Sequence, residues 1–210
     1  MSEKFQLQKY KYWIASGIFL LAAGAGVFIR YKIVMPSREA ASYLEAINGL
    51  TVGKTTEAEL LQRDAFQKAE ERCSQGECKY FMTTENKLLG QLHLAPKIHF
   101  STIVSVRENL LAGVVVFTWK EGQPAISLRQ GSQLPSGCDS EPCVKLIMPP
   151  TKVVMGISIN FSSNSALRNQ MPTMVNVACL SRLHGCPNLG EFMPIAKTMN
   201  LEPVISASRK

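Results

Sequence analysis

Six cysteines are the residues whose type and spacing most clearly predict chemistry. They form three close pairs along the chain: Cys73 with Cys78, Cys138 with Cys143, and Cys179 with Cys186. Each pair lies around or beside residues typical of a turn, among them Gly76, Pro142 and Gly185. An even number of paired cysteines is typical of an oxidising compartment. We therefore predict three local disulfides, although the count alone also allows crossed connectivities.

The alternative chemistry for these cysteines is zinc binding. Cys179, His184 and Cys186 offer three ligand atoms in a short stretch, and Cys73 with Cys78 offer a second pair. Structural zinc sites use four ligands in a tetrahedron, with a short spacing inside each pair. The spacing here does not require a metal, so disulfides are favoured and no cofactor is expected.

Few side chains are available for acid–base chemistry. The three histidines are His93, His99 and His184, and none lies in a zinc-protease or serine-hydrolase motif. A general acid or base must lie within hydrogen-bond reach of its partner. If the chain is an enzyme, we expect Glu85, His93 and His99 to meet in the fold. Otherwise these residues are structural or face solvent.

Residues 49–56 resemble a phosphate-binding loop, because Gly49, Gly53, Lys54 and Thr55 follow one another in the order of that motif. The stretch between the two glycines is one residue too short. A phosphate-binding loop also follows a buried strand, whereas a helix is predicted before this one. We therefore predict an ordinary loop that leads into a helix cap at Thr56.

An apolar segment near the N-terminus is the element that positions the rest of the chain. Tyr12–Ile29 carries no charge over 18 residues. As a helix it measures about 27 Å, close to the roughly 30 Å hydrocarbon core of a bilayer. Preceding lysines favour a cytoplasmic N-terminus. We predict cytoplasmic residues 1–11, a transmembrane anchor with its flank over residues 12–34, and contact with membrane lipid through residues 12–29.

Two other interpretations of this segment are open. Ala23-Gly24-Ala25 fits the cleavage site of a signal peptide, although the apolar run continues through Phe28 and Ile29. Cleavage there would still export the domain. A buried core helix usually has a polar face, which this segment lacks.

The net charge of +7 is concentrated around the anchor. Residues 1–38 hold six basic side chains and one acidic side chain, whereas the remaining residues hold 17 basic and 15 acidic ones. A basic excess beside an apolar helix orients the helix and attracts anionic lipid headgroups. A nucleic-acid surface would instead place basic and aromatic residues together in the domain. We therefore predict no nucleic-acid partner.

Residues 37–205 are predicted to form one extracytoplasmic α+β domain, with an antiparallel sheet packed by helices. Capping and stop residues predict helices over 38–47, over 56–72, over Pro172–Leu183 and near Leu189–Lys197. Apolar alternation or continuous apolar runs predict strands over Lys79–Thr83, Leu89–Leu94, Ile98–Arg107, Leu111–Trp119, Ala125–Arg129, Val144–Met148 and Val153–Phe161.

Two resemblances point to a bacterial envelope. Leu50–Leu61 resembles the helix opening in small envelope-assembly lipoproteins of the bacterial outer membrane, but it lacks their lipidation cysteine and their Leu-Gly-x-Pro ending. The order of anchor, Leu92–Pro96, strand series and Cys179–Cys186 is similar to uncharacterised single-pass bacterial envelope proteins with paired cysteines. This resemblance implies the periplasm and brings no activity with it.

The expected function is a binding or envelope-assembly module rather than an enzyme. The expected partner is another envelope protein, because the anchor keeps the domain beside the membrane. The alternative is an extracytoplasmic enzyme whose acid–base residues are scattered along the sequence.

Overall fold

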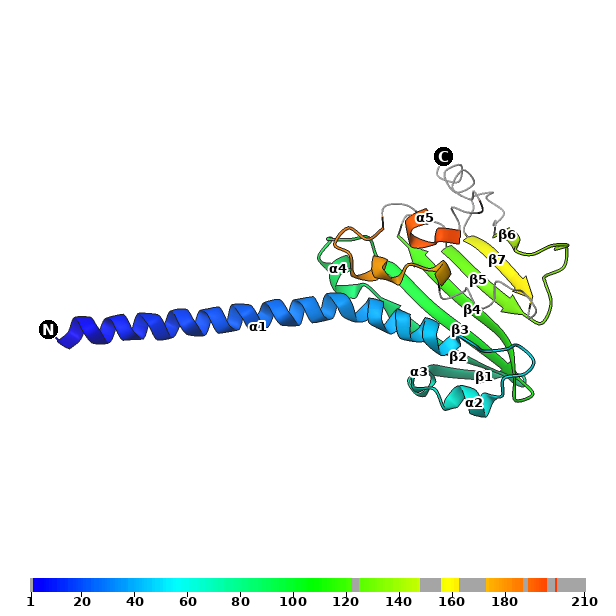
Figure 1. Ribbon diagram of the computed structural model, residues 1–210, viewed down its shortest axis with the longest axis horizontal. Coiled ribbons are helices and arrows are strands. Elements are labelled where there is room, and N and C mark those ends of the chain that lie inside the picture. The colour runs from blue at the N-terminus through cyan, green and yellow to red at the C-terminus, as the bar shows by residue number, and fades with distance from the viewer. Residues whose placement is uncertain are drawn as a thin grey trace.

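The chain forms one long N-terminal helix that projects from an α+β domain (Figure 1). The computed structural model describes residues 2–121, 125–147, 156–162, 173–186, 189–195 and 199. The described helices are α1 (Ser2–Ile47), α2 (Glu57–Leu61), α3 (Asp64–Gln67), α4 (Lys87–Gln91), the 3-10 helix η2 (Val177–Ser181) and α5 (Leu189–Phe192). The strands are β1 (Glu70–Ser74), β2 (Glu77–Glu85), β3 (Ile98–Arg107), β4 (Leu110–Lys120), β5 (Ala125–Gly131), β6 (Cys143–Ile147) and β7 (Gly156–Ser162).

Helix α1 continues without a break from the apolar segment into the domain. The prediction of a separate helix after Ser37 is therefore wrong, because Pro36 lies inside one helix. Proline removes a backbone donor and bends a helix, and Figure 1 shows α1 changing direction where it reaches the domain. The helix ends as predicted before Gly49, whose φ of +76° suits a residue without a side chain.

The described part of the chain has one helix long and apolar enough to cross a membrane. It covers Ser16–Ile47 and contains an 18-residue window of mean hydropathy 1.8, none of which is buried. The open alternative of a buried core helix does not fit this exposure.

The seven strands form one mixed sheet in the order β1-β2-β3-β4-β5-β7-β6. Neighbouring strands are antiparallel except β5 and β7, which are parallel. The prediction of a purely antiparallel meander is therefore wrong. Strand β7 is buried from Gly156 to Phe161, whereas the described side chains of β6 are half-buried or exposed. The more apolar strand therefore lies inside the sheet, and β6 forms the edge.

Most strand predictions agree with the structure. The predicted Ile98–Arg107 coincides with β3, and β2, β4 and β5 differ by a few residues at their ends. Strand β6 begins one residue before the predicted Val144–Met148, whose last residue lies outside the described residues. For the predicted Val153–Phe161, the structure describes only the part that is β7, because residues 153–155 lie outside the described residues. Strand β4 occupies the centre of the sheet, as its apolar run indicates.

Four predicted elements differ from the structure. Leu89–Leu94 lies in α4 and the turn that follows it instead of a strand. The helix predicted over 56–72 is two short helices followed by β1. The described part of Pro172–Leu183 contains the short η2, and α5 is shorter than predicted. Residues 172 and 196–197, at the ends of these predictions, lie outside the described residues.

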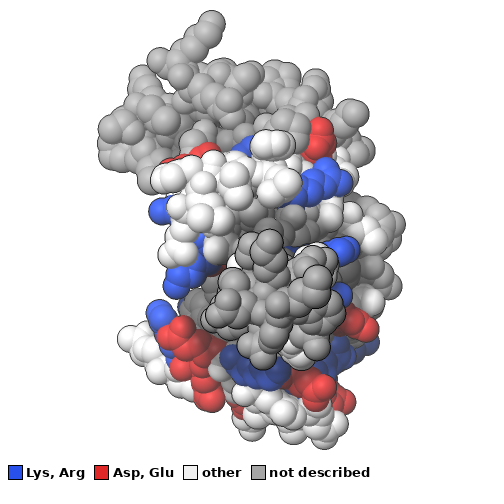
Figure 2. Space-filling view, turned by 90° about the vertical axis from the view of Figure 1, so that its left-hand side faces the viewer, with Lys and Arg blue, Asp and Glu red and all other residues white. Residues whose placement is uncertain are grey.

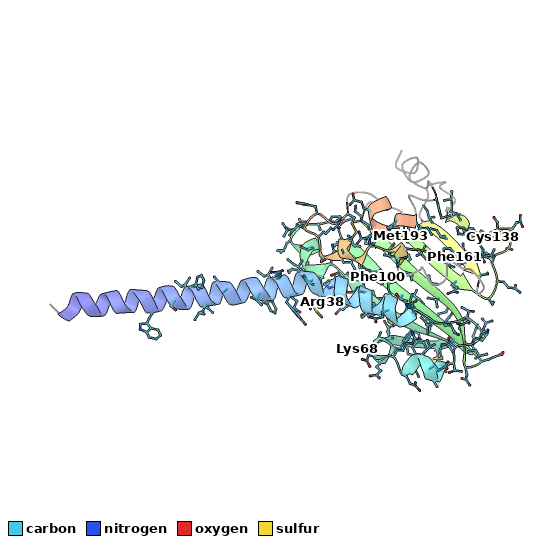
Figure 3. The ribbon with its side chains drawn as sticks, in the orientation of Figure 1. Arg38, Lys68, Phe100, Cys138, Phe161 and Met193 are labelled. Carbon is cyan, nitrogen blue, oxygen red and sulfur yellow. A yellow bond between two sulfur atoms is a disulfide. The ribbon has the colours of Figure 1, made fainter. Side chains whose placement is uncertain are left out.

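One face of the sheet, here called the first face, carries the apolar core. Its buried side chains belong to one cluster with Ala40, Leu44 and Ile47 of α1, and with Phe66, Leu180 and Phe192. Figure 3 labels three fully or nearly fully buried members of this cluster, Phe100, Phe161 and Met193. The last turns of α1 are therefore part of the domain.

Candidate functional site

The structure brings the six cysteines together in the three predicted pairs. In each pair the two sulfur atoms lie at disulfide distance, and the Cα atoms are 4.0 Å apart for Cys73 and Cys78, 5.8 Å for Cys138 and Cys143, and 5.2 Å for Cys179 and Cys186. The first pair is held by a tight hairpin turn, because Gln75 and Gly76 both have positive φ and place Cys73 opposite Cys78.

The pairs differ in their surroundings. Cys179 and Cys186 are fully buried, whereas Cys73 is exposed. The backbone carbonyl of Cys186 accepts a hydrogen bond from the Nζ of Lys120 at 2.5 Å, which ties this loop to the end of β4. The third pair is therefore built into the core, and the first lies at its margin.

The alternative zinc site does not form among the described residues. His184 is exposed, and its ligand atoms do not gather with those of Cys179 and Cys186. A compact set of possible ligands in the described parts is Glu71, Cys73 and Cys78, whose sulfurs are paired with each other.

The loop that resembles a phosphate-binding motif has no free cradle of backbone N–H groups. The N–H groups of Lys54 and Thr55 donate to the carbonyl of Thr51, and that of Gly53 donates to Leu111. Thr56 caps α2, accepting from the N–H of Glu59 while its own N–H donates to the Glu59 carboxylate. The prediction of a loop and helix cap is confirmed.

Two of the three candidate acid–base residues meet. Glu85 and His99 are opposite each other on β2 and β3, and His99 Nε2 lies 3.2 Å from Glu85 Oε2. The His99 ring also contacts the ring of Trp119 with their centroids 5.2 Å apart. His93 is exposed in the turn after α4 and has, among the described residues, no hydrogen bond or ion pair with either of them. The triad of Glu85, His93 and His99 is therefore reduced to a pair.

Glu85, His99 and Trp119 belong to the other face of the sheet, here called the second face. Its central strands carry five partly buried apolar side chains, those of Phe81, Ile103, Val115, Phe117 and Trp119. The strand register places them on one face, since Phe81, Ile103 and Val115 are paired in one row across the sheet. A sheet face toward water normally carries polar residues. Alternation identified the buried side of β3, and the continuous apolar run Val114–Phe117 indicated that β4 is apolar on both sides.

A groove lies where α1 meets the domain, here called the juxtamembrane groove. It encloses about 400 Å³ and is lined by α1 from Phe28 to Glu39, by the end of β2 and by α4. Two of the lining residues are joined by a hydrogen bond, in which the Thr84 hydroxyl of β2 donates to the Glu39 carboxylate of α1 at 2.7 Å. Sequence reasoning missed this groove because it placed a strand over the residues that form α4.

Asn86 explains why α4 stands at this position. Its side-chain oxygen accepts from the N–H of Ile98 at 2.7 Å, and its amide donates to the carbonyl of Pro96 at 2.9 Å. The residue is nearly fully buried, so both backbone groups depend on it for their partners. Asn86 thereby fixes the start of α4 against the start of β3.

Comparison of the chain with known protein families, with curated proteins and with solved structures finds no match.

Proposed function

We propose that this protein is a membrane-anchored extracytoplasmic binding module. Helix α1 crosses the membrane near residues 12–29 with its N-terminus in the cytoplasm, and the domain lies outside, in a bacterial periplasm. Three lines of support are the exposed apolar half of α1, the lysines before it and the cysteine pairs at disulfide distance. Side chains from the last turns of α1, from η2 and from α5 belong to the same apolar cluster as the first face of the sheet, and the partner would cover the partly buried apolar side chains of the second face.

The second face is the observation that carries the binding role. Aromatic residues and arginine are the side chains most enriched at protein interfaces. This face presents Phe81, Phe117 and Trp119, and Arg72 lies over the Phe81 ring at 5.0 Å from its centroid. We infer that another envelope protein covers these side chains.

Site-specific photo-crosslinking in intact cells tests this role. A benzoylphenylalanine residue replaces Phe117 on the second face, and a matched variant carries it at Glu108, an exposed turn residue between β3 and β4. We expect one defined protein adduct at position 117 and none at position 108. Equal adducts at both positions, or none at position 117, contradict the proposal.

A second candidate function, an extracytoplasmic hydrolytic enzyme, is favoured by the contact of His99 with Glu85. A carboxylate can orient an imidazole for proton transfer. The nearby Ser101 hydroxyl shares a hydrogen bond of 2.9 Å with Thr83. Turnover of ester, peptide or glycan substrates by the purified protein, lost in His99→Ala and kept in His93→Ala, would favour this candidate over the binding role.

A further inference from the structure

Three leucines are exposed on the domain near its membrane-proximal end. Leu92 is 53% exposed and Leu94 is 44% exposed in the turn after α4, and Leu183 is 54% exposed after η2. The turn is fixed by backbone bonds, because the N–H groups of Leu94 and Ala95 both donate to the carbonyl of Leu89. Figure 1 places α4 on the side of the domain from which α1 projects. The exposed side chains are therefore held near the base of the anchor.

The residues that line the juxtamembrane groove relate the position of α4 to the end of the uncharged segment of α1. Its lining includes Phe28 and Ile29, the last two residues of the uncharged segment, and extends along α1 through Pro36 to Glu39. From Phe28 to Pro36 a helix rises about 12 Å. The headgroup layer is roughly 5–8 Å thick on each side of the hydrocarbon core. If the core ends at Ile29, the groove between α1 and α4 begins at the edge of the core and extends through the headgroup layer.

The basic side chains of the groove fit an anionic headgroup. Lys32 and Lys87 line it and are exposed, and among the described residues neither has an acidic partner within 4.0 Å. Two acidic residues also line the groove: Glu39 accepts a hydrogen bond from the Thr84 hydroxyl, and Glu85 lies beside His99. Figure 2 looks onto this side of the domain and shows uncharged surface bordered by both basic and acidic side chains.

We propose that the juxtamembrane groove and the turn carrying Leu92 and Leu94 bind the bilayer surface, with anionic phospholipid as the ligand. The leucines enter the boundary between headgroups and acyl chains, and Lys32 and Lys87 contact the lipid phosphate. This contact would fix the tilt of the domain and turn the second face of the sheet in a constant direction along the membrane. The inference rests on the proposed membrane anchoring.

Photo-crosslinking to lipid tests this contact in the full chain. The protein is reconstituted in nanodiscs of phosphatidylcholine and phosphatidylglycerol in equal amounts, with benzoylphenylalanine at Leu92 or Leu94. Matched variants carry it at Leu61, which is 43% exposed, or Leu146, which is 39% exposed. Figure 1 places the elements of these control positions, α2 and β6, away from the side where α1 projects. A variant at Leu20 reports on anchoring itself.

We expect lipid adducts at positions 92 and 94 that exceed those at positions 61 and 146 several-fold. Phosphatidylglycerol should be over-represented among them, and Lys32→Gln with Lys87→Gln should return the adducts to the composition of the nanodisc. Adducts at position 20 with none above the controls at positions 92 and 94 overturn the inference and leave the anchoring intact. A lack of adducts at position 20 overturns the anchoring, and this inference with it.

Discussion

The two halves of α1 carry apolar side chains of the same kinds but place them in different surroundings. Leu20, Leu21 and Phe28 are 67%, 76% and 62% exposed, whereas Leu44 is 4% and Ile47 is 7% exposed. Each exposed leucine or phenylalanine costs about 1.5–3 kcal/mol in water relative to burial. An apolar solvent would therefore stabilise the first half of the helix, whereas the second half is buried in the domain. One continuous helix thus belongs to two structures, and each half can be changed separately.

The largest expected effect comes from charging the first half. Leu20→Arg with Leu21→Arg places two guanidinium groups at the centre of the segment, each at a cost of about 2.5–3.5 kcal/mol for insertion. We expect the protein to move from the membrane fraction to the soluble or aggregated fraction after a carbonate wash. Leu20→Ile serves as the control and should stay in the membrane. Retention of the double variant in the membrane would show that this half is not the anchor.

A change in the second half of α1 should affect the stability of the domain and leave membrane attachment unchanged. Leu44→Ala removes a buried side chain from the core and is expected to lower the free energy of unfolding by about 2–5 kcal/mol. Chemical denaturation of the detergent-solubilised protein measures this loss. Carbonate extraction should be unchanged. A variant with an unaltered denaturation midpoint would contradict the inclusion of α1 in the domain core.

The cysteine pairs sharpen the comparison inside the domain. Cys73→Ser with Cys78→Ser opens a short hairpin at the surface, with an expected loss of about 2 kcal/mol from chain entropy. Cys179→Ser with Cys186→Ser loses a similar loop constraint and also places two hydroxyl groups in the core. We therefore expect it to lower the free energy of unfolding by more than the first pair does. Peptide mapping without reduction identifies the bonds, and denaturation midpoints rank the variants. Free thiols in the exported protein would contradict the pairing.

The smallest effect belongs to the cap of α2. Thr56→Ala should lower stability by about 1 kcal/mol. The hydrogen bonds from the Thr56 backbone and side chain lower the pKa of the Glu59 carboxyl in the folded protein. The carboxylate therefore stabilises the fold at any pH above the pKa that Glu59 has in the unfolded chain, and this stabilisation is lost as the pH falls through its lower pKa in the folded protein. The denaturation midpoint of the wild type should therefore exceed that of Glu59→Gln at neutral pH, and this difference should shrink at acidic pH. A difference that grows toward acidic pH would contradict this capping box.

Sequence patterns predicted the elements whose residues interact mainly with their neighbours along the chain. The apolar alternation of β3, the cap at Thr56 and the end of α1 at Gly49 are local features, and the structure contains all three. Positions decided by distant partners were not predicted. Residues 70–72 belong to the predicted helix, but pairing with β2 makes them part of a strand.

The candidate sites show the same limit. Close cysteine spacing predicted pairs that the structure brings together, because the turn between each pair is local. The contact of Glu85 with His99 depends on the register of β2 and β3, and the juxtamembrane groove depends on where α4 packs beside α1. No spacing in the sequence specifies either arrangement. The side chain of Asn86 bonds to Pro96 and Ile98 and makes no capping bond to α4, so helix-cap preference does not account for its role.

A topology reporter tests the central claim most directly. An alkaline phosphatase, which folds and acts only after export, is fused after Lys210 of the full chain in a bacterial host, and activity is measured together with the amount of fusion protein. We predict an active fusion that stays in the membrane after a carbonate wash. An inactive fusion at equal abundance would place the domain in the cytoplasm, and an active fragment that begins near Gly26 and is released from the membrane would show cleavage instead of an anchor.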